Sequence, residues 1–150
     1  MKLILASTSP RRQQLMQMLQ VHFETAKPNF EENSSGLAPK EEALHFAKQK
    51  ALSLKDQYKN ALIVGCDTLI ECEGKIIGKP KDINDASAIL NFLSGKTHLV
   101  HSALSAYHTQ NRLSHDYLVS SAVTFKTLST QMINEYLALD KPLDKAGAYA

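Results

Sequence analysis

The sequence predicts an α/β fold in which a mixed, twisted sheet is flanked by helices. Short apolar runs typical of buried strands alternate along the chain with amphipathic helical segments, which is the pattern of an α/β protein. The strands predicted in the second half follow one another as in hairpins, so we expect antiparallel as well as parallel pairs. With 150 residues, of which 43% are hydrophobic, the chain is long enough to bury a core, and we expect a single domain over residues 1–150.

The first half of the chain predicts two short strands, two helices and a long loop. The expected elements are strands at 2–6 and 21–25, helices at 10–20 and 40–59, and a mobile loop rich in turn formers at 27–39. Ser9 is the expected N-cap of the first helix and Pro10 its first residue. Apolar residues recur every three or four positions in the second helix, at Leu44, Ala47, Ala51, Leu54 and Tyr58.

The second half predicts further strands and two capped helices. The expected elements are a strand from 61 to a turn at Glu73 and Gly74, a short strand after it, β-rich stretches at 97–108 and 117–127, and helices at 82–93 and 129–139. Asp82 caps the first of these helices, and Ser129 or Thr130 begins the second.

Composition and motif content exclude several classes of protein. The formal net charge of +2, with acids and bases interspersed, argues against a nucleic-acid-binding surface. No apolar run approaches the roughly 18 residues that span a membrane, so we expect no membrane partner. Cys66 and Cys72 would lie too far apart on one strand for a disulfide, which favours reduced thiols in a cytoplasmic protein. Dinucleotide, P-loop and nucleophile-elbow motifs are absent.

Two arginines at the start of the first helix predict a bound anion. That end of a helix is already positive, so cations there are unfavourable unless something negative joins them. Helical geometry places Arg11 and Arg12 within about 60° of the helix's apolar stripe, on its inward side. Together with the hydroxyls of Ser7 and Ser9, they form a candidate phosphate cradle. The alternative is a pair of solvated arginines on a first helical turn.

Asp67 is an unusual residue for the strand in which it is predicted. An aspartate suits a buried strand only if it is paired, caps a turn or binds a metal. Glu31 and Glu32 in the predicted loop, and Lys79 after the neighbouring hairpin, favour a functional role. Carboxylates, lysines and a phosphate cradle together indicate Mg²⁺-assisted attack on a phosphate ester or anhydride. The alternative is an ordinary capping or turn aspartate.

Lys50 and the histidines give weaker signals. Lys50 flanks the buried stripe of its helix, and spacing alone favours a side chain that snorkels outward to water. The six histidines show no spacing typical of metal ligands. His98 and His101 would face opposite sides of a strand, and we interpret them as structural or surface residues.

Six collinear segments resemble the Maf family of nucleotide pyrophosphatases, also described as septum-formation inhibitors. They are LILASTSPRRQQLM, FEENSS, AKQKA, VGCDTLIECEGKIIGKPKD, LSGKTHLV and PLDKAGAYA, and they cover essentially the whole chain. The resemblance implies an elongated α/β domain with a mixed sheet and a central cleft. It also implies hydrolysis of a nucleoside triphosphate to the monophosphate and pyrophosphate, a divalent cation (Mg²⁺ or Mn²⁺), and in many members a homodimer.

The resemblance also implies roles for individual residues. The matches to its substrate-binding positions are Ser7, Arg11, Arg12, Lys50 and Lys79. Asp67 matches the aspartate of the family's GxDT motif, and Glu32 matches its loop carboxylate. These two are therefore the expected catalytic and metal-binding residues. In this scheme water attacks the α-phosphorus in line, one carboxylate orients or deprotonates it, and the cations neutralise the triphosphate.

The ending PLDKAGAYA resembles the branch of the family that acts on dTTP and UTP. Family members normally continue beyond this segment, whereas this chain stops at Ala150, so we expect the C-terminal part of the family fold to be missing. Two other functions stay open on the sequence. One is a non-catalytic nucleotide-binding regulator linked to cell division, and the other is a hydrolase that releases orthophosphate.

Overall fold

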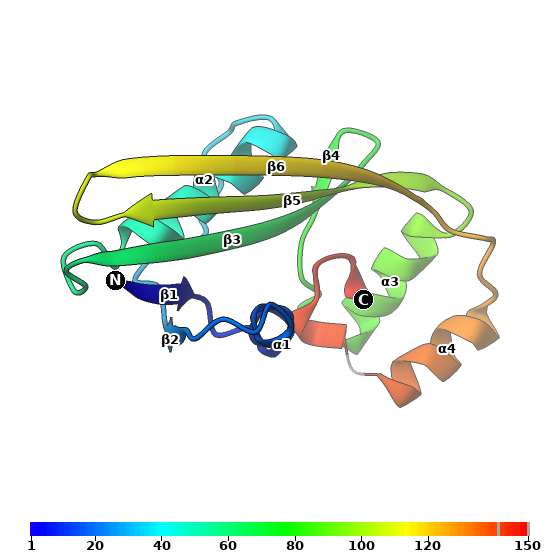
Figure 1. Cartoon of the computed structure of the whole chain (residues 1–150). Coiled ribbons are helices and arrows are strands. Elements are labelled where there is room, and N and C mark those ends of the chain that lie inside the picture. The colour runs from blue at the N-terminus through cyan, green and yellow to red at the C-terminus, as the bar shows by residue number, and fades with distance from the viewer. Residues whose placement is uncertain (141, 150) are drawn as a thin grey trace. The chain divides into compact units, whose positions relative to one another are not determined.

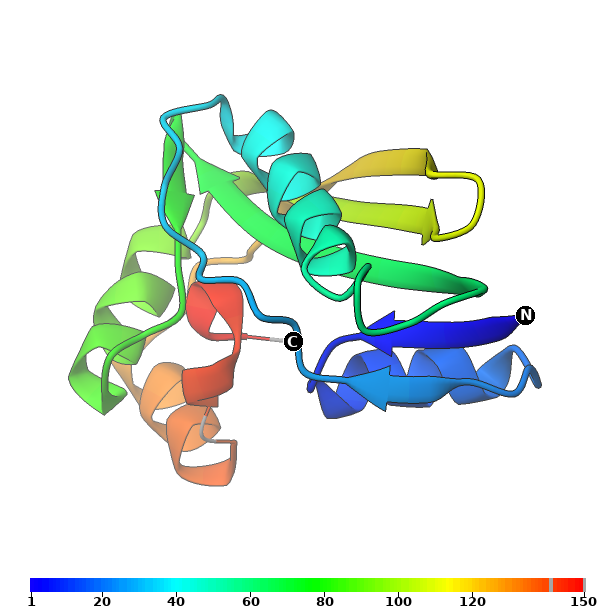
Figure 2. The same ribbon diagram turned by 90° about the vertical axis from the view of Figure 1, so that its left-hand side faces the viewer.

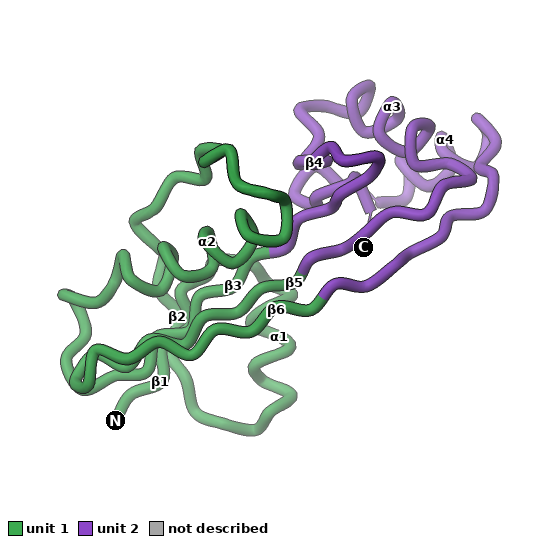
Figure 3. Tube along the Cα trace, turned by 90° about the horizontal axis from the view of Figure 1, so that it is seen from above, with its two compact units in different colours: residues 1–67, 102–119 green, residues 68–101, 120–150 purple. Residues whose placement is uncertain are grey.

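The computed structural model describes residues 1–140 and 142–149. Lys141 and Ala150 lie outside the described residues. Contacts divide the chain into two compact units, which are described separately: unit 1 holds residues 1–67 and 102–119, and unit 2 holds residues 68–101 and 120–150 (Figure 3). The prediction of a single domain stays a prediction.

Six strands of the described residues form one mixed sheet (Figure 1). The strands are β1 (Lys2–Ala6), β2 (Glu24–Ala26), β3 (Ala61–Cys72), β4 (Lys75–Ile77), β5 (Thr97–His108) and β6 (Leu113–Thr124). Their order is β2-β1-β3-β5-β6, with β4 paired to β3 beside this path. β1 pairs in parallel with both β2 and β3, whereas β3 and β4 are antiparallel. The predicted mixed sheet with flanking helices is therefore confirmed.

In unit 1, helix α2 (Pro39–Leu52) lies across one face of the strands (Figure 2). Its alanines allow a close approach to β3. A Cβ atom added at Gly65 would lie 2.1 Å from the carbonyl oxygen of Ala47, so only glycine fits there. The core residues at this contact are Ile4, Ala6, Ala51, Leu54, Ala61 and Ile63. Because side chains alternate along a strand, Asp67 points to the same face as Ile63 and Gly65.

Helix α2 ends earlier than the apolar spacing predicted, at Leu52 rather than near residue 59. The hydroxyl of Ser53 donates a hydrogen bond to the carbonyl of Lys50, and turns follow up to the start of β3. Leu54 is still buried, so the apolar periodicity marked the core correctly but not the helix end. Within the described ranges, no helix combines the length and apolar character needed to cross a membrane.

Helix α1 (Pro10–Met18) corrects a second expectation, because it buries none of its residues. Leu15 and Leu19, which mark the stripe predicted to face inward, are 63% and 65% exposed. The half-buried residues are Arg12, Gln13 and Met16. Met16 follows Leu15 by about 100° around the helix axis, so the helix is turned by roughly that angle from the expected orientation.

Unit 2 packs two capped helices against each other. Its helices are α3 (Ile83–Leu93), α4 (Thr130–Leu139) and the short 3₁₀ helices η1 (Pro142–Asp144) and η2 (Ala146–Ala148). The core between them is formed by Ala86, Leu90, Ile133, Leu137 and Ala148. The predicted N-cap Asp82 is confirmed, since its side chain accepts a hydrogen bond from the amide of Asp85. Of the two residues predicted to begin the last helix, Thr130 is its first residue, and Ser129 is its N-cap, whose side chain accepts a hydrogen bond from the amide of Met132.

Candidate active site

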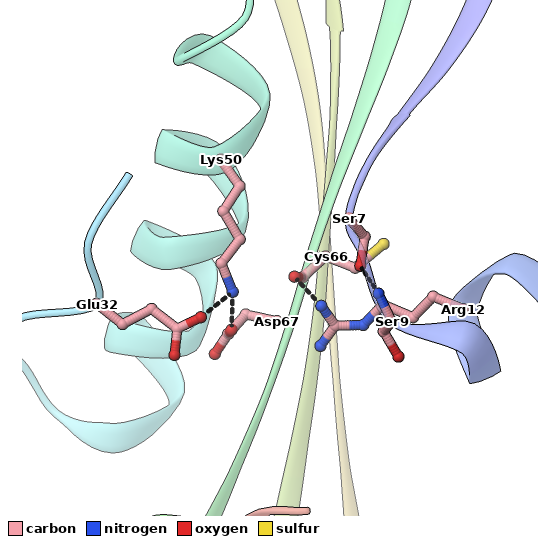
Figure 4. Close-up of polar contacts among 7 residues, drawn as sticks. All are labelled: Ser7, Ser9, Arg12, Glu32, Lys50, Cys66 and Asp67. Carbon is pink, nitrogen blue, oxygen red and sulfur yellow. Dashed lines mark hydrogen bonds and ion pairs between the residues drawn. The ribbon is translucent and has the colours of Figure 1, made fainter. Parts of the chain in front are cut away.

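A buried lysine joins two carboxylates in unit 1 (Figure 4). The Nζ atom of Lys50 lies 2.5 Å from Oδ1 of Asp67 and 2.6 Å from Oε1 of Glu32. Lys50 lies on α2, Asp67 in the middle of β3, and Glu32 in the loop between β2 and α2. Only 6% of the Lys50 side chain is exposed, so the outward-pointing side chain that spacing alone favoured is wrong.

The environment of Asp67 favours a carboxyl group that holds its proton more tightly than usual. Burial raises the pKa of Asp67, and the nearby Glu32 carboxylate acts in the same direction. The charge and hydrogen bond of Lys50 oppose this shift, as does Arg12. The Oδ2 atom of Asp67 is buried and has no hydrogen-bond partner among the described residues. A buried carboxylate oxygen without a donor is a strong acceptor for a cation, a water or a ligand proton.

The start of α1 supplies donors on the other side of β3. The Nη1 atom of Arg12 donates a 2.8 Å hydrogen bond to the carbonyl of Cys66, the residue before Asp67 (Figure 4). The buried hydroxyl of Ser7 accepts a 3.1 Å hydrogen bond from the amide of Ser9. The Ser9 side chain makes no capping hydrogen bond, so it leaves the amides of the first helical turn uncapped. Uncapped first-turn amides next to a guanidinium are an anion-binding arrangement.

The two arginines do not lie on the same side of the helix. Arg12 is half-buried and reaches β3, whereas Arg11 is exposed, so the expectation that both face inward is wrong for Arg11. The reason is geometric, because successive helical residues point about 100° apart and only one of the two can face the strand. The place of Arg11 at the positive end of α1 still leaves it next to the uncapped amides.

Lys79 follows β4 and lies in unit 2, where its side chain is exposed. Its part in substrate binding stays a prediction. Glu31 is also exposed, and the ion pair to Lys50 is made by Glu32, the residue matched to the family's loop carboxylate.

His98 and His101 are both buried and contact different partners in unit 2. The ring of His101 lies within hydrogen-bond distance of Ser120 and Glu71, at 2.7 and 2.8 Å. His98 lies 2.6 Å from the hydroxyl of Tyr149. The sequence left open whether His98 and His101 are structural or surface residues, and their burial shows that both are structural.

Sequence reasoning missed Glu42. Its side chain is buried in the first turn of α2 and accepts hydrogen bonds from the loop that carries Glu32. Acidic residues are common at helix N-termini, so nothing in its spacing set it apart from its neighbour Glu41. The only available signal was the run of serines just upstream.

Asp67 and Glu32 fit a divalent cation whose remaining ligands come from water and a substrate. Asp67 offers an oxygen atom without a protein donor among the described residues, and Glu32 is paired to the same lysine as Asp67, Lys50. No group of three or more histidine, cysteine or acidic side chains among the described residues is arranged to hold a metal. Mg²⁺ is commonly held by one or two carboxylates, with water and substrate phosphates completing its shell. The residues present therefore fit Mg²⁺ or Mn²⁺ better than a metal that needs a full protein cage.

A mixed α/β fold with uncapped first-turn amides and an arginine near a buried aspartate is typical of proteins that bind phosphates together with a cation. The chain belongs to the Maf family, since the family model described as Maf-like protein matches residues 2–150.

Two dTTP/UTP pyrophosphatases are similar to this chain over nearly its whole length. A dTTP/UTP pyrophosphatase of Aquifex aeolicus is 43% identical over 150 residues, covering 99% of this chain and 77% of the relative. A second dTTP/UTP pyrophosphatase, from Dictyoglomus turgidum, is 38% identical and covers 99% of this chain and 78% of the relative. The solved structure of the Staphylococcus aureus Ham1 protein superposes with a TM-score of 0.56 at 13% identity, covering 83% of this chain and 71% of that one. At that identity the likeness concerns the fold.

Proposed function

We propose that this chain is a nucleoside triphosphate pyrophosphatase that hydrolyses dTTP and UTP to the monophosphate and pyrophosphate. The observation that carries the proposal is the contact of the buried Lys50 with Asp67 and Glu32, together with the Oδ2 atom of Asp67, which has no protein donor among the described residues. The names of the relatives, dTTP/UTP pyrophosphatases at 36–43% identity, support this reaction and these substrates.

Cationic groups bind the triphosphate in this proposal. Arg12 and the first-turn amides of α1 hold phosphate oxygens, and the buried Ser7 hydroxyl shapes the turn that precedes them. Arg11 and Lys79 add charge from exposed positions. Lys50 is already fixed by its two carboxylates, so it places a positive charge near the reacting phosphate without having to reorganise.

Asp67 and Glu32 are the carboxylates of the proposed reaction, and they would hold a divalent cation. When bound, the cation screens the phosphate charge and makes water more acidic. One of these two carboxylates orients or deprotonates the attacking water, and the Oδ2 atom of Asp67, which has no protein donor among the described residues, is available to the cation. The choice between Mg²⁺ and Mn²⁺, the cytoplasmic location and the homodimer expected from the sequence stay predictions.

Product analysis tests this function. Purified protein is incubated with Mg²⁺ or Mn²⁺ and with dTTP, UTP, CTP, GTP or 7-methyl-GTP, and monophosphate, pyrophosphate and orthophosphate are measured separately. We expect pyrophosphate and monophosphate from dTTP and UTP. Release of orthophosphate would indicate another phosphate hydrolase, and tight nucleotide binding without turnover at any metal concentration would indicate the non-catalytic regulator.

A further inference from the structure

We infer that Glu42 is a positioning residue for Glu32. Its buried carboxylate fastens the loop between β2 and α2 to the first turn of α2, and thereby holds Glu32 at Lys50. The inference rests on the proposed function, because positioning Glu32 affects turnover only if Glu32 takes part in the reaction.

The carboxylate of Glu42 accepts its hydrogen bonds from the loop. Oε1 accepts hydrogen bonds from the amide of Ser35 at 2.6 Å, the hydroxyl of Ser34 at 3.0 Å and the hydroxyl of Ser35 at 3.2 Å. Glu42 is 2% exposed, whereas both serines are exposed residues of the loop. A buried carboxylate is tolerated only when donors compensate for its lost hydration, and charge-assisted hydrogen bonds are about twice as strong as neutral ones. The loop supplies those donors.

The position of Glu42 in the helix makes a charge there favourable. Pro39 is the first residue of α2, and the N-cap residue Ala38 offers no side-chain cap. The positive end of the helix is therefore free to stabilise a carboxylate, and Glu42 lies in this first turn. The helix and the loop thus stabilise the same charged group.

Glu32 lies between two points at which the loop is fastened to α2. Before it, the amide of Asn29 donates a 3.1 Å hydrogen bond to the hydroxyl of Ser53, and the ring of Phe30 lies 5.7 Å from that of Phe46. After it come Ser34 and Ser35 on Glu42. Figure 2 shows this loop running beside α2, from the C-terminal end of the helix back to its N-terminal end.

Helix α2 therefore carries both residues that position Glu32. It carries Lys50, to which Glu32 is paired at 2.6 Å, and Glu42, which holds the chain two to three residues beyond Glu32. Without Glu42 the loop would lose its hydrogen bonds to α2 on the C-terminal side of Glu32 and keep those contacts on the side of Asn29 and Phe30, so Glu32, whose side chain is 42% exposed, would move relative to Lys50 more freely.

The test compares three variants of the whole chain. Glu42→Ala removes the acceptor, and Glu42→Gln keeps an acceptor oxygen in the same place but removes the charge. Glu41→Ala is the matched control, because it takes the same charge from the same helical turn at an exposed position. We expect Glu42→Ala to lower kcat for dTTP hydrolysis by about 10- to 100-fold with little change in KM, as misplacement of a reacting group does. We expect Glu42→Gln to recover much of this loss and Glu41→Ala to behave as wild type.

A double-variant cycle separates positioning from a general structural effect. If Glu42 acts through Glu32, then Glu42→Ala adds little further loss in a Glu32→Gln background. Losses that multiply in the double variant would overturn the inference. Equal kcat values for wild type and Glu42→Ala would overturn it as well, even if the wild type releases pyrophosphate as proposed.

Amide hydrogen exchange measures how firmly the loop is held, without relying on activity. We expect the Ser35 amide to be protected in wild type and in Glu41→Ala, and to exchange at least tenfold faster in Glu42→Ala, because its acceptor is lost (about tenfold per 1.4 kcal/mol of hydrogen bonding). Equal exchange in all variants would show that Glu42 does not hold the loop. If exchange changes as expected but the wild type has no pyrophosphatase activity, the proposed function fails while the anchoring of the loop by Glu42 stands.

Discussion

The Nζ atom of Lys50 lies 2.5 Å from Oδ1 of Asp67, and only 6% and 5% of the two side chains are exposed. Burying two charges removes their hydration, so each depends on the other for compensation. Removing one partner leaves a buried charge that has lost its main counter-ion. This contact therefore links the stability of unit 1 to the chemistry proposed for it.

Lys50→Met should destabilise the protein in a pH-dependent way. At neutral pH the variant leaves the Asp67 carboxylate buried without its lysine, and breaking such a pair costs about 3–5 kcal/mol. The penalty should shrink as the pH falls, since Asp67 then takes up a proton and is no longer charged. Urea unfolding at pH 7.5 and pH 5 measures both effects. Lys48→Met, at a partly exposed lysine 3.5 Å from Asp116, is the control and should change the free energy of unfolding by no more than about 0.5 kcal/mol.

Asp67→Asn should remove most activity while preserving the fold. Loss of one group of this kind typically lowers kcat by about 10²–10³, which pyrophosphate release from dTTP measures. Burial raises the pKa of Asp67 above its ordinary value of 3.8, so its stabilising contribution is complete below that value and is lost as the pH rises through the folded-state pKa. The variant should therefore gain stability relative to wild type as the pH rises from 4 to 7. Wild-type turnover by a folded variant would contradict the role given to Asp67.

Much of this site follows from local sequence signals. Asp67 stood out because it interrupts an apolar strand, and the structure places it in the middle of β3 at 4% exposure. The caps at Asp82 and Ser129 were also predictable, because a capping side chain bonds to amides only a few residues away.

The features of the site and fold that could not be predicted are side-chain directions and orientations set by residues distant in sequence. Spacing left Lys50 on the edge of its helix's apolar stripe, and its inward direction is decided by Asp67, 17 residues later on another element. The orientation of α1 is likewise set by the bond from Arg12 to Cys66, 54 residues away. The burial of His101 requires the pairing of three strands that supply Glu71 and Ser120.

Gly65→Ala should displace α2 from β3. The new Cβ atom would lie 2.1 Å from the carbonyl oxygen of Ala47 and 2.7 Å from the amide nitrogen of Ala51, both backbone atoms that cannot rotate away. Overpacking of a core typically costs about 1–3 kcal/mol, and a backbone clash belongs at the upper end. Thermal unfolding of Gly78→Ala gives the control, since a Cβ atom at Gly78 meets nothing within 4 Å. Similar unfolding free energies for the two variants would contradict this account of the close approach.

His98 should make the protein less stable in mild acid. Its ring is 1% exposed, its Nε2 atom lies 2.6 Å from the Tyr149 hydroxyl, and its Nδ1 atom is buried without a hydrogen-bond partner among the described residues. A protonated ring would therefore bury a charge and a donor with nothing to accept it. Burial accordingly lowers the pKa of His98 below its ordinary value of 6.5.

The direction of the resulting pH dependence follows from proton binding. Below about pH 6.5 the unfolded chain protonates His98 while the folded chain does not, so the free energy of unfolding falls as the pH falls toward the folded-state pKa. Substituting His98→Gln removes this group from both states. We expect the stability of wild type minus that of His98→Gln to decrease between pH 7.5 and pH 5, as measured by urea unfolding, and the same comparison for the exposed His22→Gln to show no comparable decrease. A parallel pH dependence for wild type and His98→Gln would contradict a lowered pKa of His98 in the folded protein.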